Sequence, residues 1–147
     1  MRNATKTIYH KVLVFGIFDL LHPGHKYFLR QAKKYGDQLI VVVARDKVAA
    51  ELKKIPPVQF EKIRLEQIKK LKEVSFCCLG SKRINHNYEL VKKLNPDLIC
   101  VGYDQIKSLT NLKKKMRRLG LNKPIVRLGA FFPRRFKSRI YRLKLKY

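Results

Sequence analysis

Five short apolar runs, separated by stretches with helical spacing, limit the folds open to this chain more than any other feature. The runs are rich in Val, Ile and Leu and span residues 11–16, 38–44, 74–79, 98–102 and 124–128. Continuous apolar runs of this kind are typical of strands covered on both faces, as in a parallel sheet. Because helical stretches alternate with them, the pattern predicts parallel strands joined by right-handed helical crossovers.

The stretches between the runs carry helix signals. Helices are expected over residues 24–35, 60–72, 88–94 and 109–119, with a further basic one over 137–146. Gly36 and Gly120 stand just after two of these stretches, where helices commonly end. Within 60–72, the spacing of Ile63, Ile68 and Leu71 predicts that they share the buried face.

The length of 147 residues suits one compact domain, and an apolar fraction of 46% is typical of a globular protein. No apolar run approaches the roughly 20 residues of a membrane helix. The N-terminal apolar stretch, residues 12–18, is short and leads straight into Asp19 and the histidines, unlike a signal peptide. We expect one soluble, cytoplasmic α/β domain over 1–147: a Rossmann-like, doubly wound, five-stranded parallel sheet with helices on both faces and a basic C-terminal segment, 129–147.

The first apolar run ends in GIFDLLHPGH, residues 16–25, which holds two of the four histidines of the chain. In a doubly wound sheet, ligands bind at the carboxyl ends of strands and near helix N-termini, where phosphate is favoured. Pro23 suits the first turn of a helix, and Gly24 would let an anion approach the backbone. His22 and His25, three residues apart, share a face of a helical turn and can each donate to an oxyanion.

Two other interpretations of the histidines stay open at this stage. One histidine could simply cap a helix. A zinc site would need a third ligand, and the neighbouring sequence offers no convincing one.

GIFDLLHPGH resembles the GxFDxxHxGH motif of the cytidylyltransferase-like nucleotidyltransferases, the HIGH superfamily. Three later segments are similar to the same family: GDQLIVVVARD (36–46), FEKIRLEQIKKLKEV (60–74) and NPDLICVGYDQ (95–105). The resemblance implies nucleotidyl transfer: a phosphate on the acceptor attacks the α-phosphorus of ATP or CTP, and pyrophosphate leaves. It also implies Mg²⁺ on the polyphosphate and no covalent enzyme intermediate. Catalysis then consists of positioning and charge stabilisation.

The resemblance also implies roles for particular residues. The expected catalytic residues are His22, His25 and Arg64. The expected nucleotide-binding residues are Gly16, Ile17, Phe18, Gly24, Lys54, Asp104, Ser138 and Arg139, with Lys47 or Lys53 as alternatives to Lys54; no protein ligand for the metal is assigned. A solvated helix face for Arg64 and the lysines, and an ordinary turn for Asp104, remain alternatives.

The chain departs from the family pattern in two places. Ile17 stands where many relatives have a hydroxyl residue. The serine- and threonine-rich segment that opens the last helix of relatives corresponds to RRFKSRIYRLK (134–144), in which Ser138 carries the only aliphatic hydroxyl. Arg139 or Lys137 is expected to bind the β- or γ-phosphate there instead.

The acceptor is predicted from the same resemblance. VVVARD and VGYDQ are more similar to archaeal-type FAD synthases than to glycerol-3-phosphate cytidylyltransferases, which tend to have a tryptophan after the fourth strand; this chain has none. The favoured activity is FMN adenylyltransferase, and the alternative is CMP transfer to a polyol phosphate. Aromatic residues after Gly129 could stack on a flavin or belong to a core or homodimer contact.

The formal net charge of +25 raises an alternative from another class. No acidic residue follows Asp104, and the tail interleaves cations with Phe131, Phe132, Phe136 and Tyr141. Such a tail is compatible with nucleic-acid binding on a weakened nucleotidyltransferase fold.

The three cysteines form no CxxC pair. Cys77 and Cys78 would point to opposite faces of a strand and so could not share a metal. Together with Cys100 they are expected to be buried free thiols.

Overall fold

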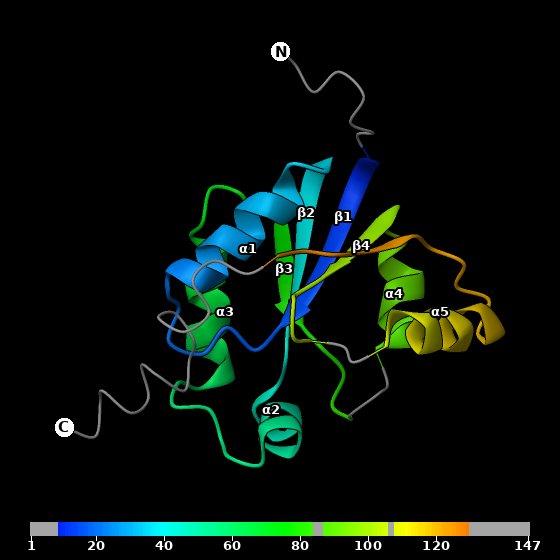
Figure 1. Ribbon diagram of the computed structural model, residues 1–147. Coiled ribbons are helices and arrows are strands. Elements are labelled where there is room, and N and C mark those ends of the chain that lie inside the picture. Colours follow the sequence, from blue (N-terminus) through cyan, green and yellow to red (C-terminus); the bar gives the residue numbers. More distant parts are fainter. Residues whose placement is uncertain (1–8, 84–86, 106–107, 130–147) are drawn as a thin grey trace.

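Strands and helices alternate along the chain in the computed structural model, which describes residues 9–83, 87–105 and 108–129 (Figure 1). The strands are β1 (Tyr9–Gly16), β2 (Gly36–Val43), β3 (Phe76–Leu79), β4 (Leu98–Val101) and β5 (Ile125–Arg127). The helices are α1 (Pro23–Lys33), α2 (Asp46–Lys53), α3 (Glu61–Lys69), α4 (Tyr88–Leu94) and α5 (Leu109–Arg118).

All five strands are parallel and lie in the order β3-β2-β1-β4-β5. The central strand β1 pairs with β2 on one side and with β4 on the other, so Val12 lies between Leu39 and Leu98. The predicted doubly wound sheet is therefore confirmed. The direction of winding reverses between β1 and β4, and in such sheets ligands bind beyond the carboxyl ends of the strands at this point.

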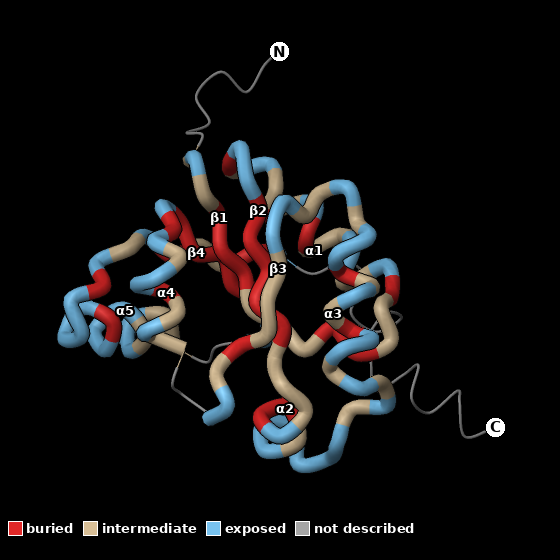
Figure 2. Tube along the Cα trace, turned by 180° about the vertical axis from the view of Figure 1, so that it is seen from behind, coloured by how far each residue is buried: buried red, intermediate tan, exposed pale blue. Residues whose placement is uncertain are grey.

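A helical layer covers each face of the sheet. Leu29 and Ala32 of α1 and Ile68 of α3 pack in the core on one face. Val91 of α4 and Met116 of α5 pack in the core on the other face. The strands form the buried centre between these layers, as Figure 2 shows. This double coverage explains why the buried parts of the strands are continuous apolar runs rather than alternating ones.

The structure differs from the sequence prediction at α2 and at the face of α3. The eight-residue helix α2 was not predicted; only Val48 and Ala49 are buried on it, which is too weak a pattern to recognise. Ile63, expected in the core, is 47% exposed. The buried residues of α3 are Arg64 and Ile68, four residues apart, so Ile63 faces outward.

The cysteines are free, as expected. Cys77 packs against the α1–α3 core and Cys78 against the α4–α5 core, which confirms that they point to opposite faces. Both are half-buried rather than buried, because β3 is an edge strand. Cys100 is buried, and burial raises the pKa of its thiol to about 12.

Among the described residues, none of the helices is both long enough and apolar enough to span a membrane. The predicted helix over 137–146 lies outside the described residues.

Candidate active site

The loop after β1 has an unusual backbone. Phe18 and Leu20 have φ angles of 55° and 52°, in the left-handed region that side chains disfavour. The ring of Phe18 is buried and lies against Gly16, where a Cβ atom would come within 2.5 Å of it. Gly16 is therefore needed for the ring of Phe18 to pack, and the loop must be held by its surroundings.

His22 and His25 form a reciprocal cap at the N-terminus of α1. The Nδ1 atom of His22 accepts a hydrogen bond from the backbone N–H of Gly24 at 3.1 Å. The Nδ1 atom of His25 accepts one from the backbone N–H of His22 at 3.3 Å. This is the arrangement of a capping box, with histidines in both positions.

The cap determines the state of both rings. Because each Nδ1 accepts a hydrogen bond, each neutral ring carries its hydrogen on Nε2. Burial lowers the pKa of His22 to about 4, and burial together with the neighbouring His22 lowers that of His25 to about 3. The two rings are therefore neutral at pH 7, and each keeps one N–H donor on Nε2.

Ring packing fixes the pair in place. The His22 and His25 rings stack with centroids 3.7 Å apart, and Phe18 meets the edge of His25 at 5.5 Å. The first turn of α1 contains no acidic residue, so its partial positive charge is not offset there. Two neutral N–H donors beside such a helix start make a site suited to a phosphate.

Asp19 ties this loop to the segment between α2 and α3, residues 54–60. Asp19 is buried, with 3% of the residue exposed, and its carboxylate accepts hydrogen bonds from the backbone N–H groups of Val58 (2.8 Å) and Gln59 (3.0 Å). In return, the Gln59 side-chain oxygen accepts a bond from the N–H of Leu20 at 3.0 Å. In the described structure, Asp19 thus holds two loops together.

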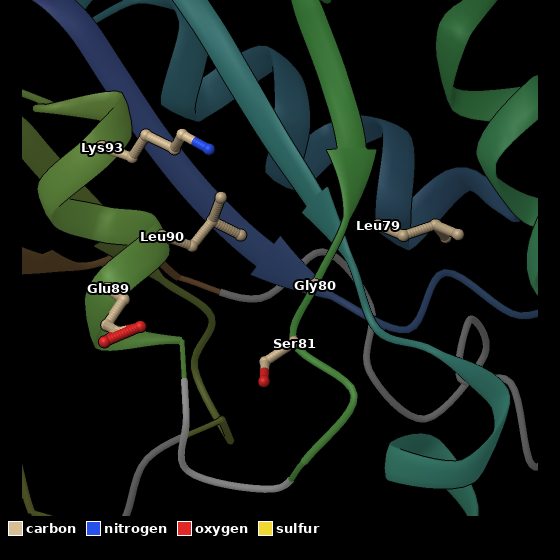
Figure 3. Close-up of a pocket in the computed structure, with 6 residues that line it drawn as sticks. All are labelled: Leu79, Gly80, Ser81, Glu89, Leu90 and Lys93. Atoms are coloured by element: carbon tan, nitrogen blue, oxygen red, sulfur yellow. The ribbon is translucent and has the colours of Figure 1, made fainter.

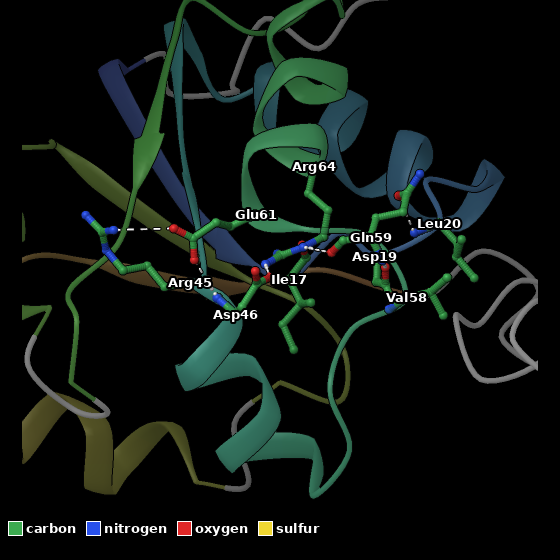
Figure 4. A network of polar contacts seen from close by, with 9 residues as sticks. All are labelled: Ile17, Asp19, Leu20, Arg45, Asp46, Val58, Gln59, Glu61 and Arg64. Atoms are coloured by element: carbon green, nitrogen blue, oxygen red, sulfur yellow. Dashed lines mark hydrogen bonds and ion pairs between the residues drawn. The ribbon is translucent and has the colours of Figure 1, made fainter.

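Arg64 is fully buried and binds protein groups with all three of its nitrogens. Nη1 donates to the carbonyl of Ile17 at 2.6 Å, Nη2 to the carboxylate of Asp46 at 2.8 Å, and Nε to the carbonyl of Gln59 at 3.0 Å. Figure 4 shows how this side chain enters between α2 and the two loops. Arg64 therefore fixes the strained backbone of the loop that carries Phe18 and the two histidines.

Sequence reasoning missed the partners that complete this network. Glu61 accepts a bond from the N–H of Asp46 at 2.8 Å and lies 3.5 Å from Arg45 (Figure 4). The Nε atom of Arg45 donates to the carbonyl of Gly80 at 2.9 Å. The only signal in the sequence was the Arg45-Asp46 pair directly after a buried strand. Charged residues at that position lie at the carboxyl edge of the sheet.

The remaining expected site residues are Lys54, Asp104, Ser138 and Arg139. Lys54 is exposed at the end of α2, and no described contact connects it with the histidines. Asp104 is exposed in the turn after β4. Its neighbour Gln105, which was not predicted, accepts from the N–H of Gly102 and donates to the carbonyl of Phe15, joining the ends of β4 and β1. Ser138 and Arg139 lie outside the described residues.

A separate hollow of about 460 Å³ lies between the end of β3 and α4 (Figure 3). It is lined by Leu79, Gly80, Ser81, Glu89, Leu90 and Lys93. None of the expected site residues lines this hollow. Over the ranges that the structure describes, no group of three His, Cys, Asp or Glu side chains is placed to hold a metal ion.

Comparisons with known proteins show which proteins this chain is similar to. Residues 13–137 match the family described as cytidylyltransferase-like. The FAD synthase of Methanohalophilus mahii is 42% identical over 119 residues, which cover 81% of each chain. That of Thermococcus onnurineus is 42% identical over 122 residues, covering 83% of this chain and 81% of the relative.

Among solved structures, a protein of Thermoplasma volcanium described as a lipopolysaccharide core biosynthesis protein is similar, with a TM-score of 0.78 and 39% identity. The match covers 84% of this chain and 98% of that one.

Proposed function

The chain belongs to the cytidylyltransferase-like family of nucleotidyltransferases, and from this premise we propose that it is an FMN adenylyltransferase, joining FMN and ATP to give FAD and pyrophosphate. The observation that carries the proposal is the pair of neutral histidines fixed at the start of α1. The relatives named FAD synthase, about 40% identical over four fifths of the chain, support the choice of acceptor.

In the proposed reaction, a phosphate oxygen of FMN attacks the α-phosphorus of ATP. A bond forms between that oxygen and the phosphorus, and the bond to the oxygen bridging to the β-phosphate breaks. The Nε2–H groups of His22 and His25 donate to the α-phosphate region and stabilise the charge that develops in the transition state. The backbone of Gly16, Ile17 and Phe18 lies against the nucleotide.

Other residues take supporting roles in the proposal. Arg64 and Asp19 act as positioning residues, because both hold the loop that carries the histidines. Gly24 leaves room for the phosphate, Asp104 binds the nucleotide, and Lys54 draws in its phosphates. In this proposal, Ser138 and Arg139 contact the triphosphate. Mg²⁺ held by the phosphates of ATP would neutralise part of their charge, and no protein ligand is assigned to it.

A pyrophosphate-release assay tests the proposal by crossing ATP and CTP with several acceptors. The acceptors are FMN, glycerol-3-phosphate and a sugar phosphate, the last because of the description of the Thermoplasma volcanium protein. We expect turnover for ATP with FMN, and FAD as the product on chromatography. Turnover of CTP with glycerol-3-phosphate alone would instead establish the polyol phosphate alternative.

The variants His22→Ala and His25→Ala are assayed alongside the wild type. Losing one preorganised donor typically lowers kcat by about 10²–10³-fold. If no pair of substrates turns over, or if both variants match the wild type, the catalytic role of the histidines is wrong.

A further inference from the structure

Exposed apolar residues are concentrated in the segment that joins α2 to α3 and in the parts of both helices next to it. Eight large apolar side chains are exposed in the part of the chain that the structure describes, and five of them fall between residues 52 and 63. These five are Leu52 (53%), Ile55 (45%), Val58 (44%), Phe60 (72%) and Ile63 (47%). We call them the apolar loop surface. Concentrated exposure of this kind marks a binding site more often than chance would place it.

The apolar loop surface is fastened to the candidate active site. The backbone N–H of Val58, a member of the surface, donates to Asp19, only three residues before His22. Gln59, between Val58 and Phe60, bonds to both Asp19 and Leu20. The segment therefore has a fixed place beside the histidine loop, and Figure 1 shows α2 beyond the carboxyl ends of the strands, on the ligand-binding side.

Positive charge borders the same segment. Lys53 and Lys54 lie at the end of α2, and Lys62 lies in the first turn of α3; all three are exposed. The ion pairs found within the described ranges join other residues, so these lysines are not neutralised by a carboxylate in those pairs. An apolar surface bordered by ammonium groups is complementary to a flat, largely apolar ring that carries a phosphate.

We propose that the apolar loop surface binds the isoalloxazine ring of FMN, while Lys53 and Lys62 attract its phosphate toward the histidines. The inference rests on the proposed function, because FMN is the acceptor it names. Phe60 is the expected main contact, since it is the most exposed of the five and a flat aromatic side chain can stack on the ring. The surface thus selects the acceptor, whereas the histidines act on the phosphates.

Two single variants, Phe60→Ser and Ile55→Ser, test the inference against Phe76→Ser as a matched control. Phe76 is also an exposed phenylalanine, at 52% against 72% for Phe60, but it lies on the edge strand β3. Steady-state kinetics with varied FMN and varied ATP are measured for each protein, and FMN binding is followed separately by quenching of flavin fluorescence. Thermal unfolding checks that all variants are folded.

The expected result is a rise of about 10-fold or more in KM and Kd for FMN in Phe60→Ser, equal to about 1.4 kcal/mol, with KM for ATP changed less than twofold. Phe76→Ser should match the wild type in every constant. An unchanged KM for FMN in both test variants overturns the inference while FAD synthesis stands. A shift in oligomeric state with the same FMN constants also overturns it, and assigns the surface to a second copy of the chain.

Failure of the proposed function would look different. If the wild type turns over another acceptor and neither forms FAD nor quenches flavin fluorescence, the choice of FMN is wrong, and the inference is wrong with it.

Discussion

His22 has two roles that a single substitution can separate. Its Nδ1 caps α1, and its Nε2 is the proposed phosphate donor. In His22→Asn, the amide oxygen can accept the Gly24 N–H in place of Nδ1, but no donor reaches the Nε2 position. We expect kcat to fall by about 10²–10³-fold with little change in the melting temperature.

His22→Ala is the matched comparison. It loses the cap as well as the donor, so it should lose about 1 kcal/mol of stability in addition to the same loss of kcat. Equal stability of the Asn and Ala variants would show that the cap contributes nothing.

The lowered pKa values of His22 and His25 predict a specific pH dependence of stability. The unfolded chain binds protons on these rings near pH 6.5, whereas the folded rings, with pKa values of about 4 and about 3, stay neutral. Folding therefore becomes less favourable as pH falls below 6.5, by about 1.4 kcal/mol per pH unit for each histidine until its folded pKa is reached. Above pH 7 the two histidines contribute no slope.

The double variant His22→Asn/His25→Gln isolates this effect, because it keeps acceptors in both positions of the capping box. Urea unfolding between pH 4.5 and 8 should give a curve of unfolding free energy that is flatter than that of the wild type below pH 6.5. Parallel curves over this range would contradict the lowered pKa values.

The strands were predictable because each contains a continuous apolar run and is followed by a turn or a helix start. The run at 11–16, for example, is buried by helices on both faces, which is what its composition requires. α2 was not predictable in the same way, since a short helix that buries two small apolar residues has almost no period. Strand ends shifted by up to two residues, because pairing with a neighbour sets them and the neighbour is not visible in the local sequence.

The candidate site was predictable only in its first half. The two histidines, the glycines around them and the strand before them are local in sequence, so their position at the start of a helix followed from spacing, whereas the cap that the histidines form was only an alternative interpretation. The bonds of Arg64 were not foreseeable, because its acceptors at Ile17, Asp46 and Gln59 come from three separate segments. A lone arginine on a helix more readily predicts an exposed charge than a buried side chain that connects three segments.

The buried contacts of Arg64 predict a large loss of stability when its side chain is truncated. Arg64→Ala removes three hydrogen bonds from a fully buried side chain and leaves the carbonyls of Ile17 and Gln59 without that donor. We expect a loss of about 3 kcal/mol in the free energy of unfolding. Faster hydrogen exchange of the Val58 and Gln59 amides should accompany it, because the α2–α3 segment loses its second attachment.

Asp46→Asn is the control for that experiment. The Asp46 side chain is 37% exposed and its replacement can still accept the bond from Arg64, so the loss should stay below about 1 kcal/mol. Because Arg64→Ala removes the ion pair together with both carbonyl bonds, an equally large loss in Asp46→Asn would show that the ion pair, and not the two carbonyl bonds, carries the stability of the network.

The acidic and the basic residues of the molecule are distributed unequally along the sequence. Two of the three ion pairs found in the described residues belong to the network around Arg64. In contrast, no acidic residue follows Asp104. In α5 the basic residues Lys113, Lys114, Arg117 and Arg118 are exposed, while Leu112 and Met116 face the core. Such a surface attracts any polyanion by charge alone.

This arrangement predicts weak binding of nucleic acid that depends on salt and not on the histidines. Because each released counterion adds to the slope, about six phosphate contacts would lower the affinity by about 10³-fold between 50 and 200 mM salt. Fluorescence anisotropy with two single-stranded 20-mers of unrelated sequence should give equal affinities for both, and His22→Asn should bind as the wild type does. Binding that persists at 500 mM salt, or that favours one sequence, would instead support a nucleic-acid-binding function for this fold, since charge alone supplies neither property.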